Sequence, residues 1–383
     1  MLATTGAGPA TSVGRLWLSD FRCLREVDIE LAPGLTVLQG ANGQGKSSVL
    51  EAIGWIARAR SFRGVTDSML VRAGADQAIV RAEVATSGRA QLFEAEIRVS
   101  GRNRVLCNRQ PVARSRDLHG LLRVTVFAPD DLTLVKGGPA ERREYVDELL
   151  AMLAARYDAA RADYDRVLKQ RNALLRAGVR DDEARSTLDV FDEQLVRAGA
   201  ELTRGRLRLL ERLVPTVAAA YASLAHDERE ITATYRSDAS PQPLTAADAD
   251  LERVDEYLRA ALARHRRAEI ERGLTLVGPH RDELHLTIDG LDARHQASQG
   301  EQRTLALALR LGGHLVVRDV AGAAPVLLLD DVFSELDAQR VAALVQNLPA
   351  GQTLLTTAGQ LPADVVAQHT FVVHAGHVVP ARR

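Results

Sequence analysis

The chain has 383 residues, 46% of them hydrophobic, which is enough for two domains of ordinary size or for one fold that carries a large insertion. Its formal net charge of -1 excludes neither nucleic acid nor protein partners, because binding depends on where the charges are placed. Only three of the 49 lysine and arginine residues are lysines (Lys46, Lys136 and Lys169). A lysine in a candidate phosphate site is therefore stronger evidence than a cluster of arginines.

Residues 1–14, MLATTGAGPATSVG, predict a flexible tail, because they lack the basic start and the apolar segment of a signal peptide. Cys23 and Cys107 cannot form a disulfide framework and do not have the spacing of a metal site. No apolar run approaches the ~20 residues needed to cross a bilayer. We therefore expect a cytoplasmic protein that makes no membrane contact.

The segment from residue 15 to about 138 is rich in predicted strands. Apolar or alternating runs occur between glycine, asparagine or proline signals. The expected strands cover residues 15–21, 25–31, 34–40, 77–86, 91–100, 104–112 and 123–129. They predict a β-rich layer on either side of a glycine-rich turn.

That turn lies in LQGANGQGKSSVLEAI, residues 38–53, which fits Gly-x4-Gly-Lys-Ser between a strand and a helix. Glycines let the backbone amides turn inward, Lys46 can reach the β and γ phosphates, and Ser47 can offer its hydroxyl to Mg²⁺. For the match to be accidental, a predicted strand, a glycine turn and a predicted helix would all have to coincide. We expect the nucleotide to be bound by Gly40, Ala41, Asn42, Gly43, Gln44, Gly45, Lys46, Ser47 and Ser48.

Residues 139–271 predict a mostly helical lobe. Apolar residues recur at steps of four and three over 141–177 and again over 188–202, with the polar turn GVRDDEARS between them. Two such helices form a short antiparallel hairpin, about 50 Å long at ~1.5 Å per residue. Pro215 is expected to kink or end the second helix. A short strand over 229–236 and a helix near 249–267 follow.

Strand character returns after residue 272. Expected strands cover 274–278, 284–289, 324–331, 352–357 and 370–376, with helices between them. The helical lobe thus separates two strand-rich segments, 15–138 and 272–383. We expect these segments to share one sheet.

The segment PVLLLDDVFSELD, residues 325–337, predicts a buried strand whose end presents two carboxylates. Asp330 could hold Mg²⁺, and Asp331 could orient or deprotonate an attacking water. The alternative is that these acids cap the following helix. The phosphate loop earlier in the chain favours the metal-binding interpretation.

A second anion site is predicted in ASQGEQRT, residues 297–304. Ser298, Gly300 and Gln302 open a helix, and a Ser-x-Gly turn at a helix N-terminus can bind an anion. An ordinary capped helix is the alternative. One chain would then carry two phosphate-binding helix N-termini, so a γ phosphate could be held between two chains.

These motifs, together with FAPDDLTLVKGGPAERREYVDELL and TLVGPHRDEL, resemble the RecF family of bacterial DNA repair ATPases, within the wider ABC/SMC/Rad50 class. The resemblance extends from about Arg15 to Gly376. It implies an α/β fold, an ABC/SMC-like P-loop ATPase head with a mostly helical inserted lobe.

The resemblance also implies roles for individual residues. Lys46 and Ser47 would bind ATP and Mg²⁺, Asp330 would be the metal carboxylate, and Asp331, with Lys46, would be catalytic. Asp337 would be the D-loop residue that crosses a dimer interface. The signature that contacts the partner's nucleotide would be Ser298, Gln299, Gly300, Glu301 and Gln302.

The sequence departs from related ATPases at several positions. Many transporter ATPases have glutamate at the position of Asp331, so the shorter carboxylate suggests slow, switch-like hydrolysis. No switch histidine follows the strand in QTLLTTAGQ, where Thr356 or Thr357 stands nearby, and no clear Q-loop glutamine occurs around FAPDD. The positions at which related heads place nucleotide or DNA arginines are occupied by Arg22, Arg60 and Arg63.

Membership of this family would imply a weak DNA-dependent ATPase that dimerises with ATP on gapped or junction DNA. It would help the mediators RecR and RecO to place RecA on single strands. The alternatives are a transporter's ATPase subunit, an SMC-like organiser, which needs a coiled coil of several hundred residues, and, with less support, a small-molecule kinase or GTPase.

DNA contact is the least direct of these inferences. A basic surface could be formed by Arg142, Arg143, Arg156, Arg161, Arg264, Arg266 and Arg267. The alternative is that these are ordinary solvated arginines on helices.

Overall fold

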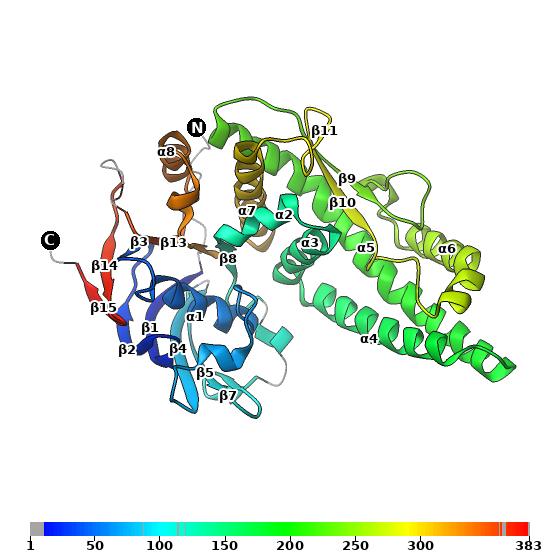
Figure 1. The fold of residues 1–383 in the computed structure, drawn as a ribbon, viewed down its shortest axis with the longest axis horizontal. Coiled ribbons are helices and arrows are strands. Elements are labelled where there is room, and N and C mark those ends of the chain that lie inside the picture. The colour runs from blue at the N-terminus through cyan, green and yellow to red at the C-terminus, as the bar shows by residue number, and fades with distance from the viewer. Residues whose placement is uncertain are drawn as a thin grey trace. The chain divides into compact units, whose positions relative to one another are not determined.

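The computed structural model of the chain describes residues 11–86, 88–112, 115–118, 120–359, 361 and 365–381. It divides into two compact units, whose elements are labelled in Figure 1. The unit called the head here holds the residues up to Asp131, 220–228 and those from Arg303 onward, and the unit called the lobe holds 132–219 and 229–302. Two of the four divisions fall inside α-helices, α5 (Asp182–Ala225) and α7 (Gln299–Ala321).

A six-stranded sheet in the head carries the phosphate-loop strand. Its order is β15-β14-β3-β13-β12-β8, and all neighbours are parallel except the β14–β15 pair. The strands are β3 (Gly34–Gln39), β8 (Val124–Phe127), β12 (Val326–Leu329), β13 (Gln352–Thr357), β14 (His369–His374) and β15 (His377–Pro380). In this order β3 and β8, which precede the lobe in the sequence, are interleaved with β12 to β15, which follow it. The two segments therefore share one sheet, as predicted.

A second, antiparallel sheet has the order β2-β1-β4-β5-β6-β7. Its strands are β1 (Ser12–Phe21), β2 (Leu24–Glu30), β4 (Gln77–Thr86), β5 (Arg89–Arg98), β6 (Arg104–Cys107) and β7 (Gln110–Pro111). The single strand expected over 104–112 is wrong. Asn108 and Arg109 have φ of 50° and 66°, the left-handed conformation typical of a two-residue hairpin turn, so the segment folds into two strands.

The first strand begins earlier than predicted. Ser12 pairs with Ala85 of β4, and the amide of Thr11 donates to the carbonyl of Ala324 at 3.0 Å. Residues 12–14 therefore belong to the sheet and not to a tail, because their backbone groups have partners there. The remainder of the expected tail, residues 1–10, lies outside the described residues.

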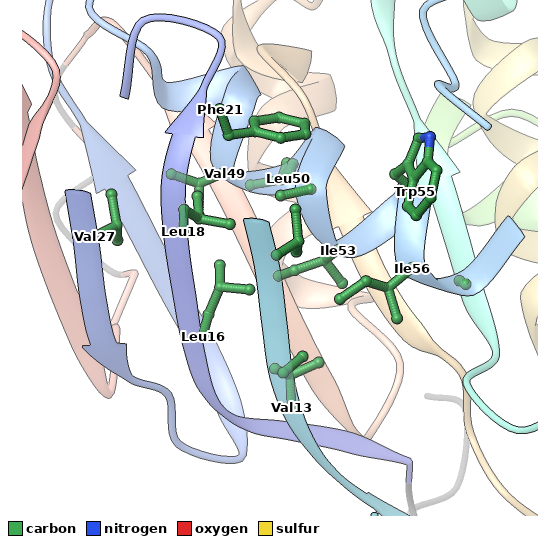
Figure 2. Close-up of a cluster of buried hydrophobic side chains, with 14 of the residues drawn as sticks. Val13, Leu16, Leu18, Phe21, Val27, Val49, Leu50, Ile53, Trp55 and Ile56 are labelled. Atoms are coloured by element: carbon green, nitrogen blue, oxygen red, sulfur yellow. The ribbon is translucent and has the colours of Figure 1, made fainter. Parts of the chain in front are cut away.

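Helix α1 (Lys46–Arg58) is buried on almost every side, because it contacts strands of both head sheets. Figure 2 shows Val49, Leu50, Ile53 and Ile56 of this helix among the apolar side chains of β1, including Leu16 and Leu18. Burying a side chain of this size stabilises a fold by roughly 1.5–3 kcal/mol. The helix that follows the phosphate loop is thus fixed in the head core.

The lobe contains the predicted helical hairpin in modified form. The helix expected over 141–177 is two helices, α3 (Pro139–Leu153) and α4 (Ala155–Ala177), because Ala154 is extended with φ -159°. Helix α5 does not end at Pro215 but continues to Ala225. A cluster of buried residues from α4, α5 and α6 (Leu251–Arg272) forms the lobe core.

The remaining lobe strands form a three-stranded sheet in the order β11-β10-β9. They are β9 (Ile231–Arg236), β10 (Glu283–Ile288) and β11 (Leu291–Asp292). Since β10 pairs with β9 of the lobe, residues 272–302 fall in the lobe unit and not in the head, where they were expected.

The strand expected over 274–278 is wrong. The amide of Thr275 donates to the side chain of Asn172, and that of Leu276 donates to Glu269, both at 2.7 Å. These backbone groups are therefore satisfied by helix side chains and not by a neighbouring strand.

Short helices complete the structure. They are α2 (Thr133–Lys136), α8 (Ala338–Gln346) and the 3-10 turns Asp67–Leu70, Ser115–Leu118, Pro129–Leu132, Ala246–Asp248 and Val332–Glu335. Across the described ranges, no helix combines the length and apolar character that crossing a bilayer requires.

Buried charges hold the lobe together. Arg206 of α5 donates to both carboxylate oxygens of Asp147 at 2.8 and 2.9 Å and to the carbonyl of Pro279 at 2.7 Å. Tyr235 donates to Asp282 at 2.6 Å. Asp282 of GPHRDEL is thus packed into the lobe interior, whereas Arg281 is exposed.

The half-buried histidine of that segment is neutral. His280 lies 2.6 Å from the hydroxyl of Tyr164 through Nδ1, and burial lowers the pKa of His280 to about 4. The segment therefore has a structural part to play in the lobe.

We expect Arg206→Leu to destabilise the lobe by about 3–5 kcal/mol, because the carboxylate of Asp147 would remain buried without its partner. The measurement is chemical unfolding followed by circular dichroism. Arg208→Leu, at an exposed position on the same helix, is the control and should change stability by less than ~0.5 kcal/mol. Equal effects of the two substitutions would contradict the ion pair's role.

Candidate nucleotide and metal site

The phosphate loop leaves β3 at Gly40 and enters α1 at Lys46, the order that the motif predicts. Gly40 approaches β14 so closely that a Cβ there would collide with the carbonyl oxygen of Val373. Gly45 has φ 107°, and a Cβ there would lie 2.8 Å from the side chains of Cys23 and Leu24. Both positions therefore need glycine for a physical reason.

The other side of the loop is held by Gln44. Its side-chain oxygen accepts a hydrogen bond of 2.6 Å from the amide of Ala375, in the turn between β14 and β15. Ala41, Asn42 and Gly43 are exposed. The loop is thus fixed at its base, while its tip is open to solvent.

Lys46 points back into this loop. Its Nζ donates to the carbonyls of Gly40 and Ala41 at 2.7 and 2.9 Å and lies 3.5 Å from Oδ1 of Asn42. Burial lowers the pKa of Lys46, whereas the charges of Asp331 and Asp330 act to raise it. The ammonium and the two carboxylates therefore belong to one electrostatic site.

Ser47 and Ser48 lie in the first turn of α1, where unpaired amides make the helix N-terminus positive. Ser48 is buried, and its amide donates to the carbonyl of Gly45 at 3.1 Å, whereas Ser47 is half-buried. The Ser47 hydroxyl is thus the one that remains accessible beside the loop.

The two predicted carboxylates follow β12 directly. Asp330 is buried and accepts a hydrogen bond of 2.8 Å at Oδ1 from the hydroxyl of Thr356. Asp331 has φ 48° and donates from its backbone amide to the same hydroxyl, also at 2.8 Å. No side chain in the described part of the chain bonds to the carboxylate of Asp331.

These residues fit a magnesium ion. Of the two Asp330 oxygens, only Oδ1 has a hydrogen-bond donor among the described residues, so Oδ2 is left as an acceptor. No group of three or more His, Cys, Asp or Glu side chains in the described ranges could hold a metal by itself. Mg²⁺ usually takes one or two carboxylates and completes its shell with phosphates and waters. Asp330 and Ser47 are the groups that would hold it here.

The three candidate arginines differ in their surroundings. Arg22, with φ 55°, donates to both oxygens of the buried Glu51 of α1 at 2.9 and 2.8 Å. Glu51 also accepts from Ser61 at 2.5 Å. Arg22 therefore joins the β1–β2 turn to α1, whereas Arg60 and Arg63 are exposed after that helix.

The turn after β8, in which no Q-loop glutamine is found, contains Asp131 instead. Its carboxylate accepts from the amide of Ala128 at 2.8 Å and from Arg310 of α7 at 3.0 and 2.5 Å. This turn is thus joined to α7 by an ion pair.

The signature segment begins α7 as predicted. The amide of Ser298 donates to Glu301 at 2.7 Å, and the amide of Glu301 lies 3.3 Å from the Ser298 hydroxyl, which is a capping box. Gln302 is buried and donates to the carbonyls of Ala293 and Arg294 at 3.0 Å. Ser298, Gln299 and Gly300 remain at least partly exposed. The helix is therefore capped in the ordinary way, as the alternative interpretation predicted, and Ser298 is still accessible.

Asp337 is the N-cap of α8. Its Oδ1 accepts from the amide of Arg340 at 2.9 Å, and its other oxygen pairs with the same guanidinium. Arg340 also donates to Thr304 of α7 at 2.9 Å. The carboxylate of Asp337 is exposed, with a relative accessibility of 51%.

Thr356 is the residue whose role the sequence reasoning did not assign. It was noted only as a neighbour of the missing switch histidine. The sequence feature that could have identified it is a pair of polar residues, Thr356 and Thr357, at the end of the buried apolar strand QTLLTT.

Comparison with known proteins identifies the family of this chain. Residues 12–358 match the family described as RecF/RecN/SMC N terminal domain. A DNA replication and repair protein RecF of Frankia alni is 49% identical over 378 residues, covering 96% of this chain and 98% of that protein. The RecF of Acidothermus cellulolyticus is 44% identical, with 96% and 98% covered.

Solved structures agree as well. A structure described as the recombination mediator protein RecF-ATPrS in the RecFOR pathway has a TM-score of 0.88, 28% identity, and coverage of 99% of this chain and 100% of that chain. The Smc head of Pyrococcus furiosus, at 17% identity and a TM-score of 0.55, with 97% and 96% covered, shows the fold alone. The α/β ATPase head with an inserted helical lobe is thereby confirmed, and the chain belongs to the RecF family of DNA replication and repair proteins.

Proposed function

We propose that this chain is a slow, DNA-dependent, Mg²⁺-requiring ATPase that dimerises with ATP and acts on gapped or junction DNA. The observation that carries the proposal is that β13 pairs in parallel both with the strand that leads to the phosphate loop and Lys46 and with the strand that leads to Asp330 and Asp331. Each of these residues lies at the carboxyl end of a parallel strand or just beyond it. Ligands of open α/β sheets bind at that edge.

The head residues divide the chemistry between them. The loop amides between Ala41 and Ser47 and the ammonium of Lys46 bind the phosphates. Ser47 and Asp330 hold Mg²⁺, which when bound neutralises charge that develops on the phosphate oxygens. The carboxylate of Asp331, which no side chain of the described ranges engages, is placed to orient a water or accept its proton. Its short side chain favours slow turnover.

Dimerisation is proposed from the second anion site. Ser298 is exposed at the N-terminus of a 23-residue helix, α7, whose first amides can bind a phosphate. In the proposed dimer each signature, residues 298–302, contacts the γ phosphate held by the partner's loop, and Asp337 crosses the interface. ADP lacks this phosphate and should leave monomers.

The proposals of DNA binding and of mediator partners rest on the relatives of this chain. They are named DNA replication and repair proteins, and the solved RecF structures are placed in the RecFOR pathway. We propose double-stranded DNA and single/double-strand junctions as ligands of this chain. By the same resemblance we propose RecR as a partner, with RecO and RecA as further ones.

The arginines suggested for a DNA surface are mostly engaged in the lobe. Arg142 is buried and pairs with Glu283 at 2.8 Å, so its assignment to a surface is wrong. Arg266 pairs with Asp189 and Asp192, and Arg267 pairs with Glu271. The pairs of Arg142 and Arg266 favour a structural role for these two residues, whereas Arg267, in an exposed pair, remains on the surface.

The alternatives lack comparable support. A transporter subunit would be unexpected in a chain whose relatives, over nearly their whole length, are RecF proteins. An SMC-like organiser would need a long coiled coil, whereas the longest helix in the described ranges, α5, has 44 residues.

Lys46→Ala should abolish ATP binding, because it removes the cation of the loop. Isothermal calorimetry with ATP and Mg²⁺ measures the affinity. Lys169→Ala, on the exposed side of α4, is the matched control and should bind as the wild type does. Unchanged affinity in Lys46→Ala would refute the assignment of the loop.

Asp331→Asn should keep ATP binding and lower turnover by roughly 10²–10⁴-fold, the range in which a general base contributes. The substitution preserves the shape of the side chain but removes its basicity. Phosphate release under saturating ATP measures the change. A normal rate would mean that another group activates the water.

Dimerisation is tested with Ser298→Arg, which adds bulk and charge at the proposed junction and leaves each phosphate loop intact. It should bind ATP but sediment as a monomer, whereas the wild type should dimerise with ATP and Mg²⁺. Ser298→Thr keeps a capping hydroxyl and should dimerise. Equal dimerisation of Ser298→Arg and wild type would exclude a shared site.

The same samples test DNA binding. Labelled duplex, single-stranded and gapped DNA are titrated with and without ATP at several salt concentrations. Wild type should bind gapped DNA more tightly with ATP, and its affinity should fall steeply with salt. An affinity that ATP does not change would contradict the proposed coupling of dimerisation to DNA.

A further inference from the structure

The hydroxyl of Thr356 is the only group in the described ranges that bonds to both consecutive carboxylate residues. Thr356 is fully buried near the end of β13, and its Oγ1 lies 2.8 Å from Oδ1 of Asp330 and 2.8 Å from the amide nitrogen of Asp331. Strand β13 lies between β3, which leads to the phosphate loop, and β12, which leads to the carboxylates.

The direction of both hydrogen bonds is fixed by chemistry. A backbone amide can only donate, so Thr356 Oγ1 accepts from the amide of Asp331 through one of its lone pairs. The single hydroxyl hydrogen is then left for Oδ1 of Asp330. Thr356 thus donates to Oδ1 of Asp330, the proposed metal carboxylate. No donor in the described chain bonds to Oδ2, so this oxygen is left as an acceptor.

The second half of the bridge acts on the backbone of Asp331. This residue has φ 48° and ψ 33°, a left-handed conformation that a non-glycine residue adopts only when its surroundings hold it there. The bond from its amide to Thr356 is one such restraint. The carbonyl of Asp331 supplies others, since it accepts from the amide and the hydroxyl of Ser334 at 3.2 and 2.8 Å.

The end of β13 also touches the phosphate loop. The amide of Gly40 donates to the carbonyl of Thr357 at 3.3 Å, and Thr356 pairs in register with Leu38 of β3. One short segment therefore contacts the loop on one side and, on the other, the carboxylate of Asp330 and the backbone amide of Asp331. The loop is thus linked to the hydroxyl bridge through one hydrogen bond, to Thr357, and the peptide bond between Thr356 and Thr357.

We infer that Thr356 is a positioning residue for hydrolysis: its hydroxyl orients Asp330 toward the metal and holds Asp331 in the conformation that presents its carboxylate. This inference rests on the proposed function of the two carboxylates. It assigns a role at a place where the sequence lacks a switch histidine.

The test compares Thr356→Val with Thr356→Ser. Valine keeps the shape of the side chain and removes the hydroxyl, whereas serine keeps the hydroxyl. For Thr356→Val we expect turnover to fall about 10- to 100-fold, the usual effect of losing a group that orients a metal ligand. Thr356→Ser should restore most of the rate.

A second readout does not depend on turnover. Calorimetry gives the ATP dissociation constant with and without Mg²⁺. For Thr356→Val, the affinity without Mg²⁺ should match wild type, and the gain in affinity that Mg²⁺ produces should be reduced. A role in packing alone would not make the loss specific to Mg²⁺.

Thr36→Val is the matched control. Thr36 is a fully buried threonine on the neighbouring strand β3, and its hydroxyl has no hydrogen-bond partner in the described chain. The same chemical change there should leave turnover and the Mg²⁺ effect unaltered. If Thr356→Val fails to fold, Thr356→Ala removes the same hydroxyl without placing a methyl group against the amide of Asp331.

Three results would overturn the inference. They are wild-type turnover and Mg²⁺ dependence in Thr356→Val, an equal loss in Thr356→Ser, or an equal loss in Thr36→Val. If the wild type itself neither binds ATP nor hydrolyses it, the proposed function fails and the inference fails with it. If the wild type does both while Thr356→Val is unchanged, only the inference fails.

Discussion

The parallel pairing of β13 with both β3 and β12 is the constraint on which the site depends. Parallel strands end at the same edge of a sheet, so this pairing brings Gly40, Asp330 and Thr356 together although more than 280 residues separate the first from the other two. Helix α1, packed between the two head sheets, fixes the far end of the phosphate loop. The chemistry of the site therefore follows from strand order, and the lobe can be inserted between β8 and β12 without disturbing it.

The parts of this site that were predictable are those with a local cause. The glycine turn, Lys46 and the acids after β12 are each encoded within a few residues, and the strand order brings the turn and the acids to one edge of the sheet. The spacing of apolar residues is also a local feature of the sequence, and it predicted the helices and the two strand-rich segments that share one sheet. What could not be predicted depends on partners distant in the chain. The hydroxyl bridge of Thr356 requires knowledge that β12 lies beside β13, and the burial of Arg142 requires Glu283, which is 141 residues away.

The errors in the fold have similar causes. Residues 274–278 have the composition of a strand, but the side chains of Asn172 and Glu269 satisfy their backbone amides. Of the two outcomes expected at Pro215, a kink or a helix end, only the end is wrong: Pro215 removes one hydrogen bond from α5, yet the helix continues because most of its apolar residues are buried on both sides of that point. Tertiary burial outweighs the ~3 kcal/mol cost of an interior proline. The two interpretations of Ser298, a helix cap and an anion site, do not exclude each other, since a capping box and an exposed helix N-terminus occur together.

The central claim is that the phosphate loop and the acids after β12 form one nucleotide and metal site whose metal carboxylate is Asp330. A crystal structure of the chain with a non-hydrolysable ATP analogue and Mn²⁺ in place of Mg²⁺ tests it most directly, because the anomalous signal locates the ion. The account predicts one ion at about 2.1 Å from the hydroxyl of Ser47. That ion should be held by Asp330 directly or through one of its waters, with the Thr356 bridge retained. An ion bound without Ser47 or Asp330, or a nucleotide bound away from residues 40–48, would contradict it.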